Sequence, residues 1–304
     1  SETYEERRRQ YLDYVLSNPA PEGLKGHFYE LVRVAENKSP VHNGYFRAAV
    51  NYIDQRRDCA DFVMLGVQRL LFQFPDSPLV PKEVYNESRR ALLDFKYWPD
   101  EPGIDSMCTW TENHQIMFST NEYLSGQMYP EEVFTNSGMT GKQKMVKARR
   151  RILQWLDLRF YTGFNEWLSN VYFDEDLTAL INLIDFCDDS EIVNKSAMVA
   201  DLLLFDMAIN SWRGQFVSTH GRSYFKEKTY APDESTSDTS KLVFGMGCYA
   251  QRDNMSAVTL ALSAKYKVPD SIISIGKEIE RHEVVNRQRI GINVKEARKW
   301  GLNR

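Results

Sequence analysis

The sequence contains no long run of apolar residues. Its most apolar stretch, residues 202–209, is interrupted by Asp206 and preceded by Asp201, whereas a transmembrane helix needs about 20 mainly apolar residues. Residues 1–10 are charged and lack the apolar centre of a signal peptide. We therefore expect no membrane span and no signal peptide in this chain. Because the chain begins with Ser1 rather than Met, we expect a processed or trimmed product.

Cysteines are few and widely separated, and they form neither a Cys-x-x-Cys pair nor a Cys/His ligand pattern. The four are Cys59, Cys108, Cys187 and Cys248. Cysteines of this kind are typical of small buried side chains, with disulfides as the alternative. The sequence also has no P-loop, G-x-G-x-x-G, H-E-x-x-H or G-x-S-x-G motif. These absences predict no metal site and no cofactor.

An excess of positive charge is also absent. The 38 Lys and Arg residues face 42 Asp and Glu residues, which gives a net charge of −4. Proteins that bind nucleic acid usually present a basic face, so we expect no nucleic-acid partner. Aromatic rings are plentiful instead, with 16 Tyr, 16 Phe and 6 Trp; such rings fill a core or stack on sugars and bases.

Apolar residues recur at helical spacing along most of the chain, and proline or polar turns separate the segments. This pattern predicts an all-α fold of stacked α-hairpins, arranged as an (α/α) toroid or an incomplete toroid. We expect residues 1–304 to form a single helical domain, with the alternative that the chain is a fragment of a longer protein that continues past residue 304. Helices are expected over residues 4–17, 24–36, 43–55, 59–74, 81–95, 111–124, 141–159, 174–187, 190–213, 252–266 and 270–282.

The composition of these segments predicts two layers. The more apolar helices (residues 59–74, 116–124 and 190–213) are expected inside, and the amphipathic helices (residues 4–17 and 141–159) outside. Residues 226–240 are polar and predict a loop, and residues 283–294 alternate in a way that predicts extended chain.

Several acids have expected structural roles. Asp174 and Asp176 are expected to be charges at a helix N-terminus. Asp201 and Asp206 lie in apolar sequence, so we expect them to pair with a cation such as Arg149 or Arg150, with a strongly shifted pKa as the alternative.

A first polar cluster, Trp110-Thr111-Glu112-Asn113-His114-Gln115, stands where a helix begins. Asn113 and His114 fall in its first turn, where free backbone N–H groups and the helix dipole favour an anion such as a carboxylate. The alternative is helix capping by Thr109 or Thr111, with solvated neighbours.

A second polar cluster, Ser218-Thr219-His220-Gly221-Arg222-Ser223-Tyr224, follows the 190–213 helix. In an extended segment His220, Arg222 and Tyr224 face the same side. Arg can bind a carboxylate through two hydrogen bonds, and His and Tyr can exchange protons. The alternative is a surface loop with a packed Tyr.

An Asn-His pair on an inner helix, with Arg and Tyr in a later loop of an all-α toroid, resembles the (α/α)-toroid polysaccharide lyases, which include the alginate and glycosaminoglycan lyases. The resemblance implies a polysaccharide or oligosaccharide substrate that contains uronate, and an extracellular or periplasmic location. It assigns Asn113 and Arg222 to neutralising the uronate carboxylate, His114 or His220 to removing the C5 proton, and Tyr224 to protonating the leaving oxygen. Tyr230 competes with Tyr224 for the last role.

Two other functions remain open from the sequence. Glu112 and Glu166 lie in aromatic-rich loops and can act as the two carboxylates of a glycoside hydrolase, with Trp110 and Trp167 as sugar-stacking platforms. The chain can instead be a non-catalytic helical module that binds a glycan or a protein. The sequence does not indicate the oligomeric state.

Overall fold

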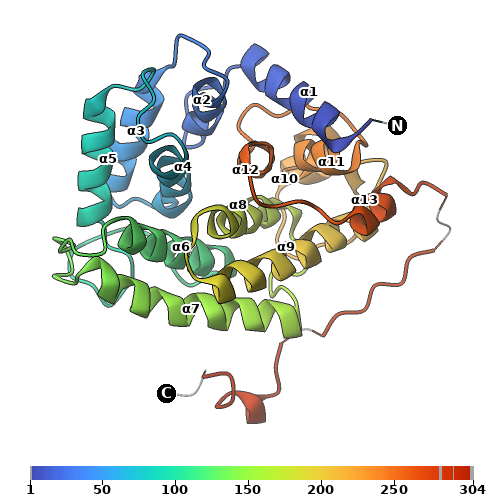
Figure 1. Ribbon diagram of the computed structural model, residues 1–304. Helices are drawn as coiled ribbons and strands as arrows, with labels where there is room; N and C mark the ends of the chain where they lie inside the picture. The colour runs from blue at the N-terminus through green and yellow to red at the C-terminus, as the bar shows by residue number, and fades with distance from the viewer. Residues whose placement is uncertain (1, 281–282, 290, 302–304) are drawn as a thin grey trace.

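Helices account for nearly all regular structure in the computed structural model, which describes residues 2–280, 283–289 and 291–301 (Figure 1). The only strands within these ranges are β1 (Ser211–Trp212) and β2 (Gln215–Phe216), which form one antiparallel hairpin. The fold is therefore all-α, as predicted. Its helices are α1 (Tyr4–Ser17), α2 (Gly26–Ala35), α3 (Asn43–Asp54), α4 (Ala60–Gln73), α5 (Lys82–Asp94), α6 (Glu112–Met128), α7 (Gly141–Thr162), α8 (Asn170–Phe186), α9 (Ser190–Asn210), α10 (Phe225–Thr229), α11 (Ser237–Phe244), α12 (Met255–Leu262) and α13 (Asp270–Lys277), with 3-10 turns η1 (Ala231–Asp233) and η2 (Val294–Glu296).

The inner layer is a ring made of α2, α4, α6, α8 and α12. Each of these helices contacts the next one, and α12 contacts α2, so the ring closes. Most of their residues are buried, including every residue of α12. In Figure 1, α4, α8 and α12 lie inside an outline formed by α1, α5, α7 and α13. The predicted two-layer stack of α-hairpins is confirmed.

The inner helices run in the same direction. Hydrogen bonds between neighbouring helices join N-terminal end to N-terminal end and C-terminal end to C-terminal end. Their N-termini consequently meet at one end of the ring. The pairs are Asp61–His114 and Asp174–Ser256 near the first turns, and Gln127–Phe186 and Asp185–Ser263 near the last turns.

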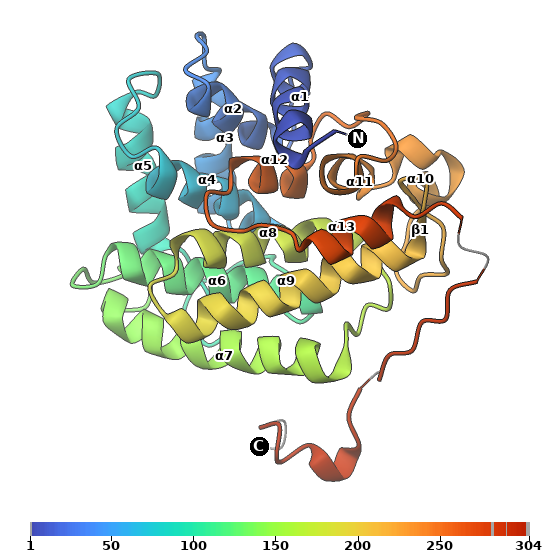
Figure 2. The same cartoon turned by 45° about the vertical axis from the view of Figure 1, so that its right-hand side comes forward.

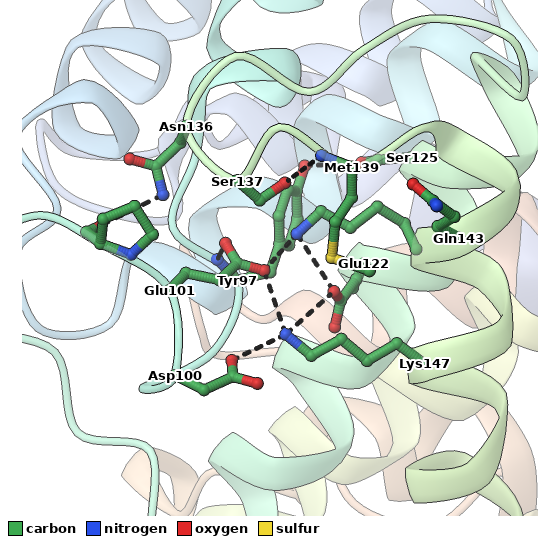
Figure 3. A network of polar contacts seen from close by, with 12 residues as sticks. Tyr97, Asp100, Glu101, Glu122, Ser125, Asn136, Ser137, Met139, Gln143 and Lys147 are labelled. Carbon is green, nitrogen blue, oxygen red and sulfur yellow. Dashed lines mark hydrogen bonds and ion pairs between the residues drawn. The ribbon is translucent and has the colours of Figure 1, made fainter.

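The α6–α7 hairpin is held together by a buried ion network (Figure 3). The Lys144 ammonium of α7 is fully buried between Glu101 and Glu122, and its Nζ lies 3.2 Å from Glu122 Oε1. Lys147 reaches Glu101 from the more exposed side, with Nζ 3.4 Å from Oε1. The backbones approach closely beside this network, since a Cβ at Gly126 would stand 2.5 Å from the carbonyl oxygen of Gly141.

The sequence predicted that the helix over residues 190–213, which is α9, lies in the inner layer, and this prediction was wrong. Only part of its circumference is buried, and Met198 and Phe205 are exposed. It packs on α7 and α8 and is covered on another side by α13 (Figure 2). The inner helix at this point of the chain is α8.

Residues 226–240 do not form the expected loop. They contain most of α10, all of η1 and the start of α11. Residues 283–289 do lack helix and strand, and the chain then returns to the body, where Trp300 O accepts a hydrogen bond of 2.5 Å from Gln154.

The acids of α8 and α9 have other partners than expected. Because α8 begins at Asn170, Asp174 and Asp176 lie beyond its first turn and are buried. Asp201 accepts a hydrogen bond of 2.7 Å from Tyr266 OH, and Asp206 is bound by Gln288. Arg149 pairs instead with residues at the start of α9, Asp189 and Glu191.

The cysteines are unbridged. Cys187 is buried as expected, whereas Cys59 and Cys108 are half-buried and Cys248 is exposed. None of the helices within the described ranges has the length and apolar character that a bilayer crossing requires.

Candidate functional site

Ionisable side chains gather at the end of the ring where the inner helices begin. Lys25 precedes α2, Asp61 is the second residue of α4, His114 lies in the first turn of α6, and Glu166 stands in the loop before α8. Free N–H groups and the positive end of each helix dipole favour carboxylates at such a place. The polar cluster at Trp110–Gln115 is thus one part of a larger constellation.

Asp61 orients His114. The Nδ1 of His114 donates to Asp61 Oδ2 over 2.5 Å, and both side chains are buried. Burial lowers the pKa of His114, but the hydrogen bond and charge of Asp61 outweigh it, so this pKa is raised above its ordinary value. Burial raises the pKa of Asp61, because it disfavours the charged carboxylate. The pair leaves Nε2 as the second nitrogen of the ring, as in catalytic Asp-His pairs.

The side-chain oxygen of Asn113 forms hydrogen bonds with residues next to it in the chain. Its Oδ1 accepts hydrogen bonds from His114 N at 2.7 Å and from Thr111 Oγ1 at 2.5 Å. Thr111 is at the N-cap position, but its side chain accepts no capping hydrogen bond. Asn113 therefore fixes the backbone that carries His114.

Glu112 anchors the loop between α7 and α8. Its buried carboxylate pairs with Arg159 of α7 and accepts a hydrogen bond of 2.7 Å from the backbone N–H of Asn165 and a longer one, 3.5 Å, from that of Glu166. Trp155 Nε1 donates to its carbonyl oxygen at 2.9 Å. Burial raises the pKa of Glu112, and Arg159 opposes this rise.

Glu166 connects this loop with the second cluster. Its Oε1 lies 3.3 Å from Arg222 Nη1. Arg222 Nη2 donates to Tyr224 OH at 3.2 Å, and the Tyr224 and Tyr172 hydroxyls share a hydrogen bond of 2.6 Å. The Arg222 guanidinium also lies 4.1 Å from the centre of the Tyr172 ring. Burial raises the pKa of Glu166, and the charges of Arg222 and, to a smaller extent, His114 oppose this rise.

The backbone joins the same two loops. Gly221 N donates to Trp167 O at 2.8 Å, and a Cβ at Gly221 would contact Trp167 at 3.5 Å. Trp167 is half-buried against the core, whereas Trp110 is 74% exposed and Tyr224 48% exposed.

His220 and Tyr230, the alternative base and acid, have other contacts than His114 and Tyr224. His220 bonds within its own loop, where its Nδ1 lies 2.7 Å from Ser218 O, and its ring packs on Phe216. Tyr230 is exposed at the C-terminal end of α10. Neither side chain forms a hydrogen bond or an ion pair with Arg222 or Glu166 within the described residues.

Sequence patterns missed several members of this site. Burial raises the pKa of Glu175 to about 7, against the opposing charge of Lys25, whose Nζ is 3.5 Å away. Burial also raises the pKa of Asp176 well above its usual range, with the charges of Glu112, Glu166 and Glu175 adding to the effect. Of these residues, only Asp61 had a sequence signal that could have identified it, because it is an acid inside an apolar run.

A pocket of about 360 Å³ lies beside Glu112 and Arg159, between α6 and α7. Aromatic and cationic side chains line it together with the loop before α8, among them Trp98, Arg151, Trp155, Arg159 and Asn165. Arg151 and Arg159 of this lining pair with Glu122 and Glu112, so their charges are compensated within the protein.

The comparisons with known proteins give no relative from which to assign this site. No protein-family model, curated protein or solved structure matches the chain.

Proposed function

We propose that the protein is a carbohydrate-active enzyme that cleaves a uronate-containing polysaccharide by β-elimination. The observations that carry the proposal are the hydrogen bond between His114 and Asp61 at the end of the helix ring where the inner helices begin, and the hydrogen bond between Arg222 and Tyr224 in the second polar cluster. Glu166 forms an ion pair with Arg222 of the second cluster, and the charge of His114 in the first cluster opposes the rise of its pKa.

Each group has a defined role in the proposed reaction. The Nε2 of His114 removes the C5 proton, while Asp61 holds the ring by Nδ1. The electron pair of the C5–H bond forms the C4–C5 double bond, the C4–O bond breaks, and Tyr224 OH protonates the departing oxygen. Arg222 stabilises the charge that develops on the uronate carboxylate, and pre-placed donors of this kind supply much of catalysis. Asn113 acts as a positioning residue for His114 in this arrangement.

The acids around the site affect how strongly the protein repels the negative charge of a uronate. Glu175 and Asp176 have raised pKa values, so their neutral forms persist to higher pH than those of ordinary carboxyls. Neutral acids repel a substrate carboxylate less than charged ones do.

The test is turnover of a panel of uronate polysaccharides, including alginate and glycosaminoglycans, followed by the ultraviolet absorbance of the new double bond. His114→Ala and Tyr224→Phe should each lower the rate by about 100-fold or more, the usual contribution of a general acid or base. His220→Ala and Tyr230→Phe are the matched controls and should keep the rate within a few-fold. Loss of activity in a control but not in its counterpart, or glycan binding without turnover, would contradict the proposal.

A specific observation favours hydrolysis as the second candidate. Glu166 Oε2 is buried and has no hydrogen-bond partner among the described residues, and burial raises the pKa of this carboxyl. A carboxylic acid in such surroundings is suited to protonate a glycosidic oxygen. New reducing ends without ultraviolet absorbance, lost in Glu166→Gln, would replace the lyase by a hydrolase. Glu112 is less suited to the partner role proposed from the sequence, because Arg159 and two backbone N–H groups engage its carboxylate.

A further inference from the structure

Three groups that commonly bind metals meet beside the candidate site. Asp58 and Cys59 directly precede α4, and His114 comes from the first turn of α6. A carboxylate oxygen of Asp58, the Cys59 sulfur and a ring nitrogen of His114 all lie within 4.8 Å of one another. The ligands of a tetrahedral zinc ion lie roughly 3–4 Å apart, so about an ångström of side-chain adjustment brings these atoms into range.

The surroundings orient two of the three groups for a ligand. Asp61 holds Nδ1 of His114, which leaves Nε2 as the ring nitrogen that a metal can take; a carboxylate in this position is the usual companion of a metal-bound histidine. Asp58 Oδ1 accepts hydrogen bonds from Cys59 N at 3.1 Å and Cys108 N at 3.0 Å, and these bonds fix its carboxylate.

The place is also reachable from solvent. Asp58 is exposed and Cys59 is half-buried, whereas His114 forms the buried floor. Cys59 has a φ of 72°, in the left-handed region, so its side chain leaves the backbone in a direction that an ordinary helix start does not give.

We propose that Asp58, Cys59 and His114 form a site for Zn²⁺. Thiolate, imidazole and carboxylate together are a typical zinc donor set, and three protein ligands leave a fourth position for water. On binding, the Cys59 thiol loses its proton to solvent as the S–Zn bond forms. The site also has a consequence that rests on the proposed function: bound zinc occupies the nitrogen that His114 needs as a base, so Zn²⁺ inhibits elimination.

Cobalt reports on this site directly. Metal-free full-length protein is titrated with Co²⁺ and then with Zn²⁺, and absorbance is recorded. The expected result is one equivalent of Co²⁺ with a sulfur-to-cobalt charge-transfer band, displaced by Zn²⁺. Cys59→Ser should abolish the band, and Asp61→Asn should weaken Zn²⁺ binding by about 10–100-fold, the usual effect of losing a companion carboxylate.

Cys108→Ser and Cys248→Ser are the matched controls, and both should keep the band. Thermal melting of each metal-free variant shows whether the fold survives, and Asp58→Asn provides a second ligand variant if Cys59→Ser does not fold. The zinc site is refuted if the wild-type protein shows no sulfur-to-cobalt band. It is also refuted if the band persists in folded Cys59→Ser. Tight Zn²⁺ binding with undiminished elimination leaves the site standing and removes His114 from the role of base.

Discussion

At the scale of single residues, the deeply buried carboxyls set how stability depends on pH. Glu234 is buried and accepts hydrogen bonds from Thr236 N at 2.8 Å and Thr236 Oγ1 at 2.6 Å. Burial raises its pKa to about 7, Thr236 and Asn170 oppose the rise, and the nearby Glu227 adds to it. The largest influences on the pKa of Glu234 thus include an acid but no cation.

The raised pKa has a definite sign for stability. The folded protein binds the proton of Glu234 more tightly than the unfolded chain does, so this contribution is complete below about pH 4 and is lost as the pH rises through 7. Glu234→Gln mimics the protonated form. Relative to wild type, its free energy of unfolding should therefore rise by on the order of 3 kcal/mol between pH 4 and pH 8. Urea denaturation across this range measures it, with the exposed Glu87→Gln as the control whose profile parallels wild type. Parallel profiles for both variants would refute this account.

At the scale of elements, Lys144 is what the α6–α7 hairpin depends on. It is fully buried, and its ammonium lies between two buried carboxylates and 5.0 Å from the Tyr97 ring. Lys144→Met leaves Glu101 and Glu122 without their central cation. We expect a loss of about 3–5 kcal/mol in the free energy of unfolding, the usual cost of breaking a buried ion pair from one side.

Lys147→Met is the matched control, because Lys147 contacts the same Glu101 from a position that is 20% exposed. Its loss should be about 1 kcal/mol or less. Equal losses in the two variants, measured by urea denaturation, would mean that burial of Lys144 contributes nothing.

Helix positions were predictable wherever local signals agreed. Pro81 marks the start of α5, and apolar spacing located α4 and α7 to within a few residues. The layer of a helix is not a local property. The apolar sequence of α9 looked suited to the inside, but a second helix, α13, covers part of its surface from 60 residues later in the chain. The polar composition of residues 226–240 likewise concealed short helices that tertiary contacts stabilise.

In the candidate site, too, some residues could be predicted from local sequence signals and others could not. Polar residues at helix starts and in turns led to the prediction of Glu112, His114, Arg222 and Tyr224 as site residues. The partners that define their chemistry come from distant segments: Asp61 is 53 positions from His114, and Glu166 is 56 positions from Arg222. No sequence spacing encodes such pairs, since only the closure of the ring brings them together.

At the scale of the whole molecule, one buried residue ties the two halves of the ring. Arg69 of α4 donates to Asn182 Oδ1 and Asp185 Oδ2 of α8, with distances of 2.8–3.0 Å. Asp185 also accepts from Ser263, directly after α12. Helices from the first and last parts of the chain therefore meet at a polar link in which Arg69 is fully buried and Asp185 nearly so.

If the ring is one cooperative unit, the chain unfolds in one transition. Far-ultraviolet circular dichroism and tryptophan fluorescence should then give the same midpoint in urea. Arg69→Met should lower the free energy of unfolding by about 3–5 kcal/mol, because it leaves Asp185 buried without its cation, and the transition should stay single. Arg89→Met removes an exposed pair with Glu132 and should cost less than about 1 kcal/mol. Separate midpoints for the two probes would show instead that residues 1–304 contain more than one folding unit, and Arg69→Met would then shift only one of them.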